Sequence, residues 1–175
     1  MTPSMSVHTF SRDEILSHID ALADILANCV NGGASVSFML PFSQHDACAF
    51  WRGVAESVGR QERTVLVCRD EQGALIGTVQ LLTDQPENQP HRADVAKLLV
   101  HEKARRRGVA MALMEALEAV AREQGKTVLV LDTASGSGAE TFYQRGGWVK
   151  VGEIPQYALM PDGEMTATTV FYKFL

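Results

Sequence analysis

Three consecutive arginines, Arg105 to Arg107, lie between the end of an apolar run and the expected start of a helix. The small residues Gly108 and Ala110 come directly after them, on either side of a valine. The first N–H groups of a helix have no partner and carry partial positive charge, so a helix start attracts anions. Guanidinium groups add paired donors for phosphate oxygens, and small residues let a ligand approach the backbone. The turn predicts a phosphate or pyrophosphate site; the alternative is a solvated helix start.

The elements that must position this turn follow the order β, α, α, β, β, β, α, β, α, β, β. Ser11 with Glu14 and Ser43 with Asp46 have the spacing of helix N-terminal caps. The expected helices run from Ser11 to Gly32, from Ser43 onward, from the arginine turn to Gly125, and over about 138–146. The expected strands are 5–10, 63–69, 74–82, 93–101, 127–132, 148–154 and 166–174, with a loop from Pro155 to Gly163 between the last two. No repeat or linker interrupts this order, so we expect a single domain over residues 1–175.

The composition is that of a soluble globular protein, with a formal net charge of −5. An acidic chain does not favour a nucleic-acid partner, and no apolar run is long enough to cross a membrane. Cys29, Cys48 and Cys68 are odd in number and lack metal-ligand spacing, which indicates buried free thiols in a reducing compartment. We therefore expect a cytoplasmic protein without a bound metal.

Two common nucleotide motifs do not explain the arginine turn. The sequence contains neither the P-loop pattern nor the Gly-x-Gly-x-x-Gly fingerprint. The stretch from Val130 to Gly138 is similar to the glycine loop of methyltransferases that use S-adenosylmethionine. Only 37 residues follow Gly138, too few for the alternating strands and helices that such a site opens.

A family resemblance rests on two blocks. Arg105, Gly108 and Ala110 match the pattern Arg/Gln-x-x-Gly-x-Gly/Ala, which resembles motif A of the GCN5-related N-acetyltransferases (GNAT). The segment Ala139 to Trp148 is similar to the family's Ala-x-x-x-Tyr-x-x-x-Gly-Phe segment, with Trp in place of Phe. Further stretches at 30–39, 131–133 and 160–163 resemble the tabtoxin-resistance branch of the same family. The resemblance implies a GNAT fold: one α/β (α+β) domain with a mixed twisted sheet of about seven strands and about four helices, splayed near the fourth strand.

The resemblance also implies where acetyl-CoA binds. Backbone N–H groups of the arginine turn would hold the pyrophosphate, and the preceding strand would pair with the pantetheine arm as an added strand does. An N–H near Val100 would polarise the thioester carbonyl. Because Gly136 stands where many members have asparagine, Ser137 or the backbone would supply the contacts there. The residues expected to bind the donor are Leu98, Leu99, Val100, Arg105, Arg106, Arg107, Gly108, Val109, Ala110 and Ser137.

Three side chains are candidates for moving protons. Asp94 lies on the strand before motif A, where several family members carry a glutamate base, and partial burial in its apolar run would raise its pKa. Asp132 ends the neighbouring strand, so both carboxylates are candidates for one pocket; the alternative for either is a partner such as Arg92, a helix start or solvent. Tyr143 aligns with the tyrosine that often protonates the departing thiolate in this family, and its alternative is a core tyrosine.

The acceptor pocket is expected around two regions that the resemblance places beside it. Ser35 and Phe38 precede the second predicted helix, and Tyr157 lies in the predicted loop between the last strands. Aromatic side chains in such segments serve packing as often as binding.

Together these features predict transfer of the acetyl group of acetyl-CoA to a primary amine of a small molecule, amino-acid-like or antibiotic-like, by direct attack. No cysteine occupies a motif position, which argues against a covalent acyl-enzyme. The alternatives are a non-catalytic acyl-CoA-binding regulatory module and a protein N-acetyltransferase. The sequence leaves open whether the chain forms a homodimer.

Overall fold

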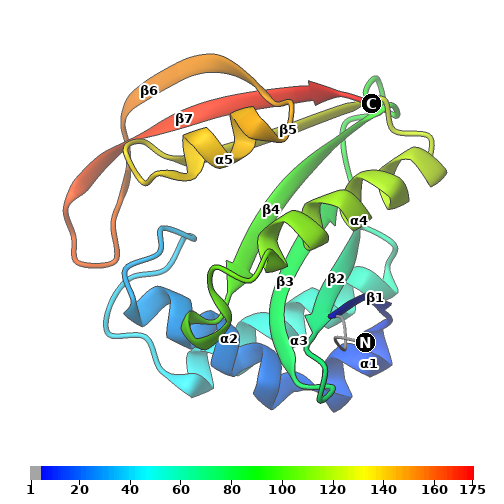
Figure 1. Ribbon diagram of the computed structural model, residues 1–175, viewed down its shortest axis with the longest axis vertical. Helices are drawn as coiled ribbons and strands as arrows, with labels where there is room; N and C mark the ends of the chain where they lie inside the picture. The colour runs from blue at the N-terminus through cyan, green and yellow to red at the C-terminus, as the bar shows by residue number, and fades with distance from the viewer. Residues whose placement is uncertain (1–4) are drawn as a thin grey trace.

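The computed structural model describes residues 5–175, and its strands form one mixed seven-stranded sheet (Figure 1). The order across the sheet is β1-β2-β3-β4-β5-β7-β6. All neighbours are antiparallel except β4 and β5, which are parallel. The strands are β1 Ser6–Phe10, β2 Arg63–Arg69, β3 Leu75–Leu82, β4 Arg92–Val100, β5 Val128–Ala134, β6 Val149–Leu159 and β7 Met165–Phe174. The predicted GNAT-type sheet is confirmed.

The parallel pair β4 and β5 separates soon after it begins. The two strands are in register only from Arg92 to Asp94 on β4 and from Val128 to Val130 on β5. The rest of each strand has no partner across this gap, and Figure 1 shows β4 and β5 diverging. The predicted splay beside the fourth strand is therefore present, and it leaves backbone groups of β4 open toward β5.

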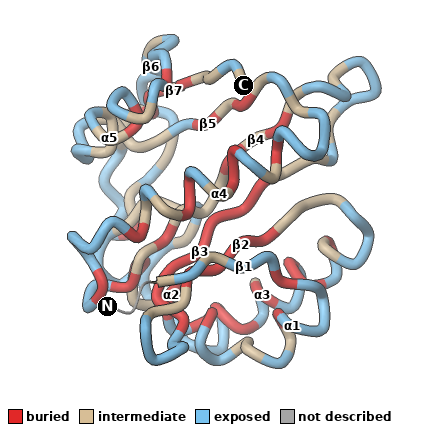
Figure 2. Tube along the Cα trace, turned by 45° about the vertical axis from the view of Figure 1, so that its right-hand side comes forward, coloured by how far each residue is buried: buried red, intermediate tan, exposed pale blue. Residues whose placement is uncertain are grey.

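Helices cover both faces of the sheet, and each face has its own hydrophobic core. The helices are α1 Arg12–Ser17, α2 Ile19–Asn31, α3 Gln44–Gly59, α4 Val109–Glu123 and α5 Ala139–Arg145, with a short 3-10 turn at Glu102–Ala104. Helices α1 to α3 share a core with Phe10, Val65 and Leu99, whereas α4 and α5 pack on Leu81 and Leu131. Figure 2 shows the buried positions gathered along the central strands between these layers. Both predicted N-terminal caps form, Ser11 with Glu14 and Ser43 with Asp46.

The N-terminus of α4 lies very close to the sheet. A Cβ added at Gly77 of β3 would lie 2.8 Å from Cγ1 of Val109 and 3.1 Å from Cδ1 of Leu113. Only glycine leaves room for this approach, so Gly77 helps to fix the start of α4 against β3. The arginine turn just before Val109 is thereby held at the end of β4.

Two boundary predictions need correction. The first expected helix is broken at His18 into α1 and α2, because the His18 backbone leaves the helical region (φ −115°, ψ 21°) and its ring packs on Phe10 at 4.9 Å. The expected loop from Pro155 is instead part of β6, which continues to Leu159 with a register shift between Ile154 and Ala158. β6 is an edge strand, where a proline costs no ladder hydrogen bond.

No helix within residues 5–175 is both long and apolar enough to cross a membrane.

Candidate active site

A cavity of about 450 Å³ occupies the gap where β4 and β5 diverge. Its walls come from 95–98 of β4, 131–134 of β5, Tyr143 of α5, the 35–39 loop and the facing parts of β6 and β7. The 35–39 loop continues to Leu40, whose N–H donates to the carbonyl of Pro161 at 3.0 Å in the β6–β7 turn. Distant segments of the chain therefore close one chamber around the splay.

The wall that β4 contributes contains a bulge. Leu99 pairs with Thr78 and Ala96 pairs with Gln80, so Lys97 and Leu98 together face Val79 alone. Lys97 has a φ of 57°, and such a bulge leaves backbone groups without ladder partners. The unpaired N–H and C=O groups beside the cavity suit a ligand that adds to β4 as another strand would.

The arginine turn lies beyond the end of β4, outside this cavity. Arg105, Arg106 and Arg107 are exposed, and Gly108 begins α4 with a φ of 78° and no side-chain cap. The backbone N–H groups from Arg106 to Ala110 donate to no backbone carbonyl in the described part of the chain. Open N–H groups, a helix start and three guanidinium groups together can hold a diphosphate.

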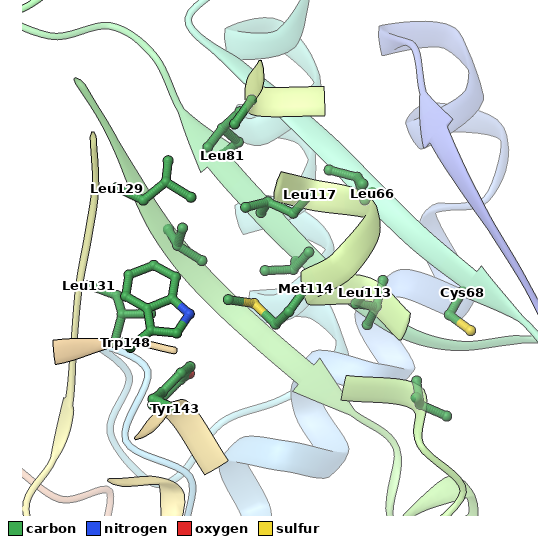
Figure 3. Close-up of a cluster of buried hydrophobic side chains, with 14 of the residues drawn as sticks. Leu66, Cys68, Leu81, Leu113, Met114, Leu117, Leu129, Leu131, Tyr143 and Trp148 are labelled. Carbon is green, nitrogen blue, oxygen red and sulfur yellow. The ribbon is translucent and has the colours of Figure 1, made fainter. Parts of the chain in front are cut away.

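Tyr143 is placed by α5 so that its ring is buried and its edge reaches the cavity. The ring packs against Phe142 at 5.2 Å, Trp148 at 6.0 Å and Phe171 at 5.7 Å, and only 8% of the residue is exposed. Figure 3 shows Tyr143 beside Trp148 in this cluster. Burial, with a smaller contribution from the Asp132 charge, raises the pKa of Tyr143 to about 12. The phenol therefore carries its proton throughout the neutral range.

Asp132 lies on β5 and also lines the cavity. The Thr168 hydroxyl on β7 donates to its Oδ2 at 2.6 Å, and Oδ1 has no hydrogen-bond partner among residues 5–175. The register explains this contact, since Asp132 pairs with Val170 and its diagonal neighbour is Thr168. Asp132 thus offers one positioned carboxylate with a free oxygen.

Asp94 is not brought to the cavity, although its strand does neighbour that of Asp132. Arg92 donates to its Oδ1 and Gln85 donates to its Oδ2 at 3.0 Å. Both oxygens are occupied by these donors, so the structure places Asp94 in the ion pair that was its alternative interpretation. The expectation of a shared pocket for the two carboxylates is corrected accordingly.

Of the three residues expected to bind the acceptor, two line the cavity and one does not. Ser35 and Tyr157 line the cavity, and Tyr157 is 54% exposed at its rim. Phe38 is outside it and packs against Phe42 at 4.7 Å and Phe50 at 5.2 Å. Phe38 is therefore a partly buried packing residue of the loop that carries Ser35.

A family model described as the acetyltransferase (GNAT) family matches residues 34–148. This match covers most of the chain and contains β4, the arginine turn, β5 and Tyr143. The chain belongs to the GNAT acetyltransferase family. It is an acetyl-CoA-dependent N-acetyltransferase, and acetyl-CoA is its co-substrate.

Solved structures with low identity share the GNAT fold over nearly the whole chain. A GCN5-related N-acetyltransferase from Kribbella flavida has a TM-score of 0.80 at 18% identity, with 98% of each chain covered. An acetyltransferase from Salmonella typhimurium, solved with its cofactor acetyl-CoA, has a TM-score of 0.79 at 18% identity, with 98% of this chain and 94% of that chain covered. A ribosomal-protein-alanine N-acetyltransferase from Brucella melitensis has a TM-score of 0.78 at 19% identity, with 97% and 99% covered.

The residues expected to bind the donor lie in different surroundings. Leu98 lines the cavity, Leu99 is buried in the core, and the carbonyl of Val100 accepts a hydrogen bond from the Cys29 thiol at 3.4 Å. Ser137 is exposed just before α5, and its hydroxyl accepts from the N–H of Ala139 at 3.4 Å. No cluster of three or more metal-ligating side chains occurs among residues 5–175.

Sequence reasoning missed two residues of the GNAT cavity. Lys97 projects from the β4 bulge and lines the cavity, and Thr168 holds Asp132. A lysine inside the apolar run from Val95 to Leu99 was a signal for the first. No local pattern marks Thr168, because its role depends on the β5–β7 register.

Proposed function

We propose that this GNAT protein acetylates a primary amine of a small molecule, by direct attack of the amine on acetyl-CoA within the β4–β5 cavity. The observation that carries the proposal is the presence of Asp132 and Tyr143 on the walls of one chamber. When bound, acetyl-CoA supplies an activated acetyl thioester. Every proton movement that the transfer needs then falls to residues of this chain.

Asp132 serves as the base in this proposal, directly or through a water molecule. An acceptor amine is an ammonium at neutral pH and must lose a proton before it can attack. Oδ1 of Asp132 is free to accept that proton, while Thr168 fixes the other oxygen. A positioned base of this kind typically contributes 10²- to 10⁴-fold, as an order-of-magnitude estimate.

Tyr143 serves as the acid that protonates the departing thiolate. An acid must keep its proton until the leaving group needs it, and burial holds the Tyr143 pKa at about 12. A free thiol has a pKa of about 8.5, so this phenol is the weaker acid, and the proposal requires its hydroxyl to be oriented toward the departing sulfur. Unpaired backbone N–H groups at the Lys97–Leu98 bulge would hydrogen-bond the thioester carbonyl.

A small acceptor is supported by the volume of the cavity, about 450 Å³, and by the link between two of its walls. The Leu40–Pro161 hydrogen bond ties the 35–39 loop to the β6–β7 turn, so both acceptor-side walls are held together. Ser35 and Tyr157 are proposed as acceptor contacts on these walls. All three cysteines are free and buried, which supports a reducing, cytoplasmic location.

The proposal is tested by release of free thiol from acetyl-CoA in the presence of a panel of amines, with product masses confirming N-acetylation. We expect turnover with at least one small amine and none when amines are omitted. Tight CoA binding with no turnover for any amine would indicate a non-catalytic acyl-CoA-binding module. Turnover only with protein or peptide amino termini would indicate a protein N-acetyltransferase.

A further inference from the structure

Lys97 is a half-buried cation that lines the cavity. Its Nζ donates to the hydroxyl of Ser37 at 3.4 Å and lies 5.9 Å from the ring centroid of Phe50. Within the part of the chain that the structure describes, no carboxylate lies within ion-pairing distance of this nitrogen. A charged amine that has lost part of its hydration and has no counter-ion is destabilised, so an anionic ligand in the cavity would stabilise it.

The environment of Lys97 points to an anion as its partner. Burial lowers the pKa of the Lys97 ammonium, and the charge of Arg63 acts in the same direction. An anion bound beside Nζ would restore the interaction that water no longer supplies. The hydroxyls of Ser35 and Ser37 stand on the same wall and can donate to the same group.

Asp132 carries the opposite charge on the other side of the cavity. It stabilises the Lys97 ammonium through space, yet the two side chains form no ion pair with each other. They project from β4 and β5, the two strands that diverge to open the cavity. A molecule between them meets one cationic and one anionic group.

We propose that the acceptor is a zwitterion, an amine that also bears a carboxylate or similar acidic group, and that Lys97 binds the acidic group. This inference rests on the proposed function for the position of the amine near Asp132. Binding of the anion by Lys97 directs the amino group toward Asp132 and the thioester. The phosphates of the donor are assigned to the separate arginine turn, which leaves the Lys97 charge for the acceptor.

The experiment measures binding of the standard L-amino acids to the CoA-loaded protein by calorimetry, with each ligand that binds compared with its own carboxamide. We expect the carboxamide to bind weaker on the order of 10- to 100-fold, the range for loss of one charge-assisted hydrogen bond. Lys97→Met should bind acid and amide alike, and Lys97→Arg should restore part of the preference. Lys126→Met, the same change at a half-buried lysine outside the cavity whose Nζ donates to the Pro90 carbonyl at 2.8 Å, should keep this preference in full.

Two results would overturn the inference: no amino acid binds, or the preference for the acid survives in a Lys97→Met protein that still binds CoA normally. Acetyl transfer is then followed with acetyl-CoA for the same ligands. An amino acid that binds through Lys97 without being acetylated would contradict the proposed function, and only the binding of the acidic group by Lys97 would remain of this inference. Acetylation of neutral amines as efficiently as of zwitterionic amines would support the proposed function and contradict this inference.

Discussion

The carboxylates of Asp94 and Asp132 differ in what their oxygens contact, and this difference decides which is free to accept a proton. Both oxygens of Asp94 accept hydrogen bonds, from Arg92 and Gln85. Asp132 uses one oxygen for Thr168 and keeps the other for the cavity. Two residues that looked equivalent in the sequence therefore differ in their contacts, and we propose a chemical role for Asp132 alone.

Substitution of each carboxylate by its amide separates these roles. Asp132→Asn should lower kcat/KM by about 10²-fold or more at pH 7, because the ammonium then has no base. The deficit should shrink as the pH rises, since more of the amine is already neutral. Asp94→Asn is the matched control, and its pH–rate profile should follow the wild type. A larger loss in Asp94→Asn than in Asp132→Asn would reverse the assignment.

At the scale of elements, the arginine turn depends on a backbone that few residues adopt. Gly108 starts α4 with a φ of 78°, and the helix start fixes the open N–H groups proposed for the diphosphate. The left-handed region costs other residues about 1 kcal/mol or more. The geometry of this turn, and not only its charge, is therefore expected to determine affinity for acetyl-CoA.

Gly108→Ala should lower the free energy of unfolding by about 1 kcal/mol and raise the KM for acetyl-CoA. The added Cβ meets only the end of Met5 at 3.8 Å, so strain and not a clash is tested. Gly73→Ala is the control, because Gly73 has a φ of 84° with nothing within 4 Å of its Cβ and lies in the β2–β3 turn. It should lose similar stability at unchanged KM. An unchanged KM in Gly108→Ala would contradict the role of this turn.

The helices and strands were predictable from the sequence where short local patterns determine them. The candidate site was predictable only in part. Both N-terminal caps and all seven strands follow from short patterns around residues such as Ser11 and Ser43. The break at His18 depends on its contact with Phe10 of β1. The continuation of β6 past Pro155 depends on its position at the edge of the sheet. The contacts of Asp132 and Lys97 are likewise tertiary, so residue types alone did not reveal them.

At the scale of the whole molecule, an acidic body carries a local basic turn. The chain has a formal net charge of −5, whereas Arg105 to Arg107 stand exposed before α4. The body repels an anionic donor, and we propose that the turn attracts the donor through short-range contacts that salt screens.

The Kd of acetyl-CoA should therefore rise with ionic strength, since the Debye length falls to roughly 3 Å at 1 M salt. A variant with Arg105, Arg106 and Arg107 all changed to Gln should bind more weakly and show a flatter salt dependence. Titration calorimetry at several salt concentrations measures both. Equal slopes for the two proteins would remove the arginines from the donor site.

Tyr143→Phe tests the central claim most directly. This claim is that acetyl transfer occurs between the diverging strands β4 and β5, with Tyr143 as the acid. The substitution keeps the ring and its aromatic contacts and removes only the hydroxyl. The measurement is kcat for thiol release, alongside the Kd of CoA, between pH 6 and 10. We predict a fall in kcat of roughly 10²-fold or more with nearly unchanged CoA affinity, and no loss of wild-type activity from Tyr143 ionisation, because its pKa is about 12. Equal kcat values for the two proteins would contradict the account.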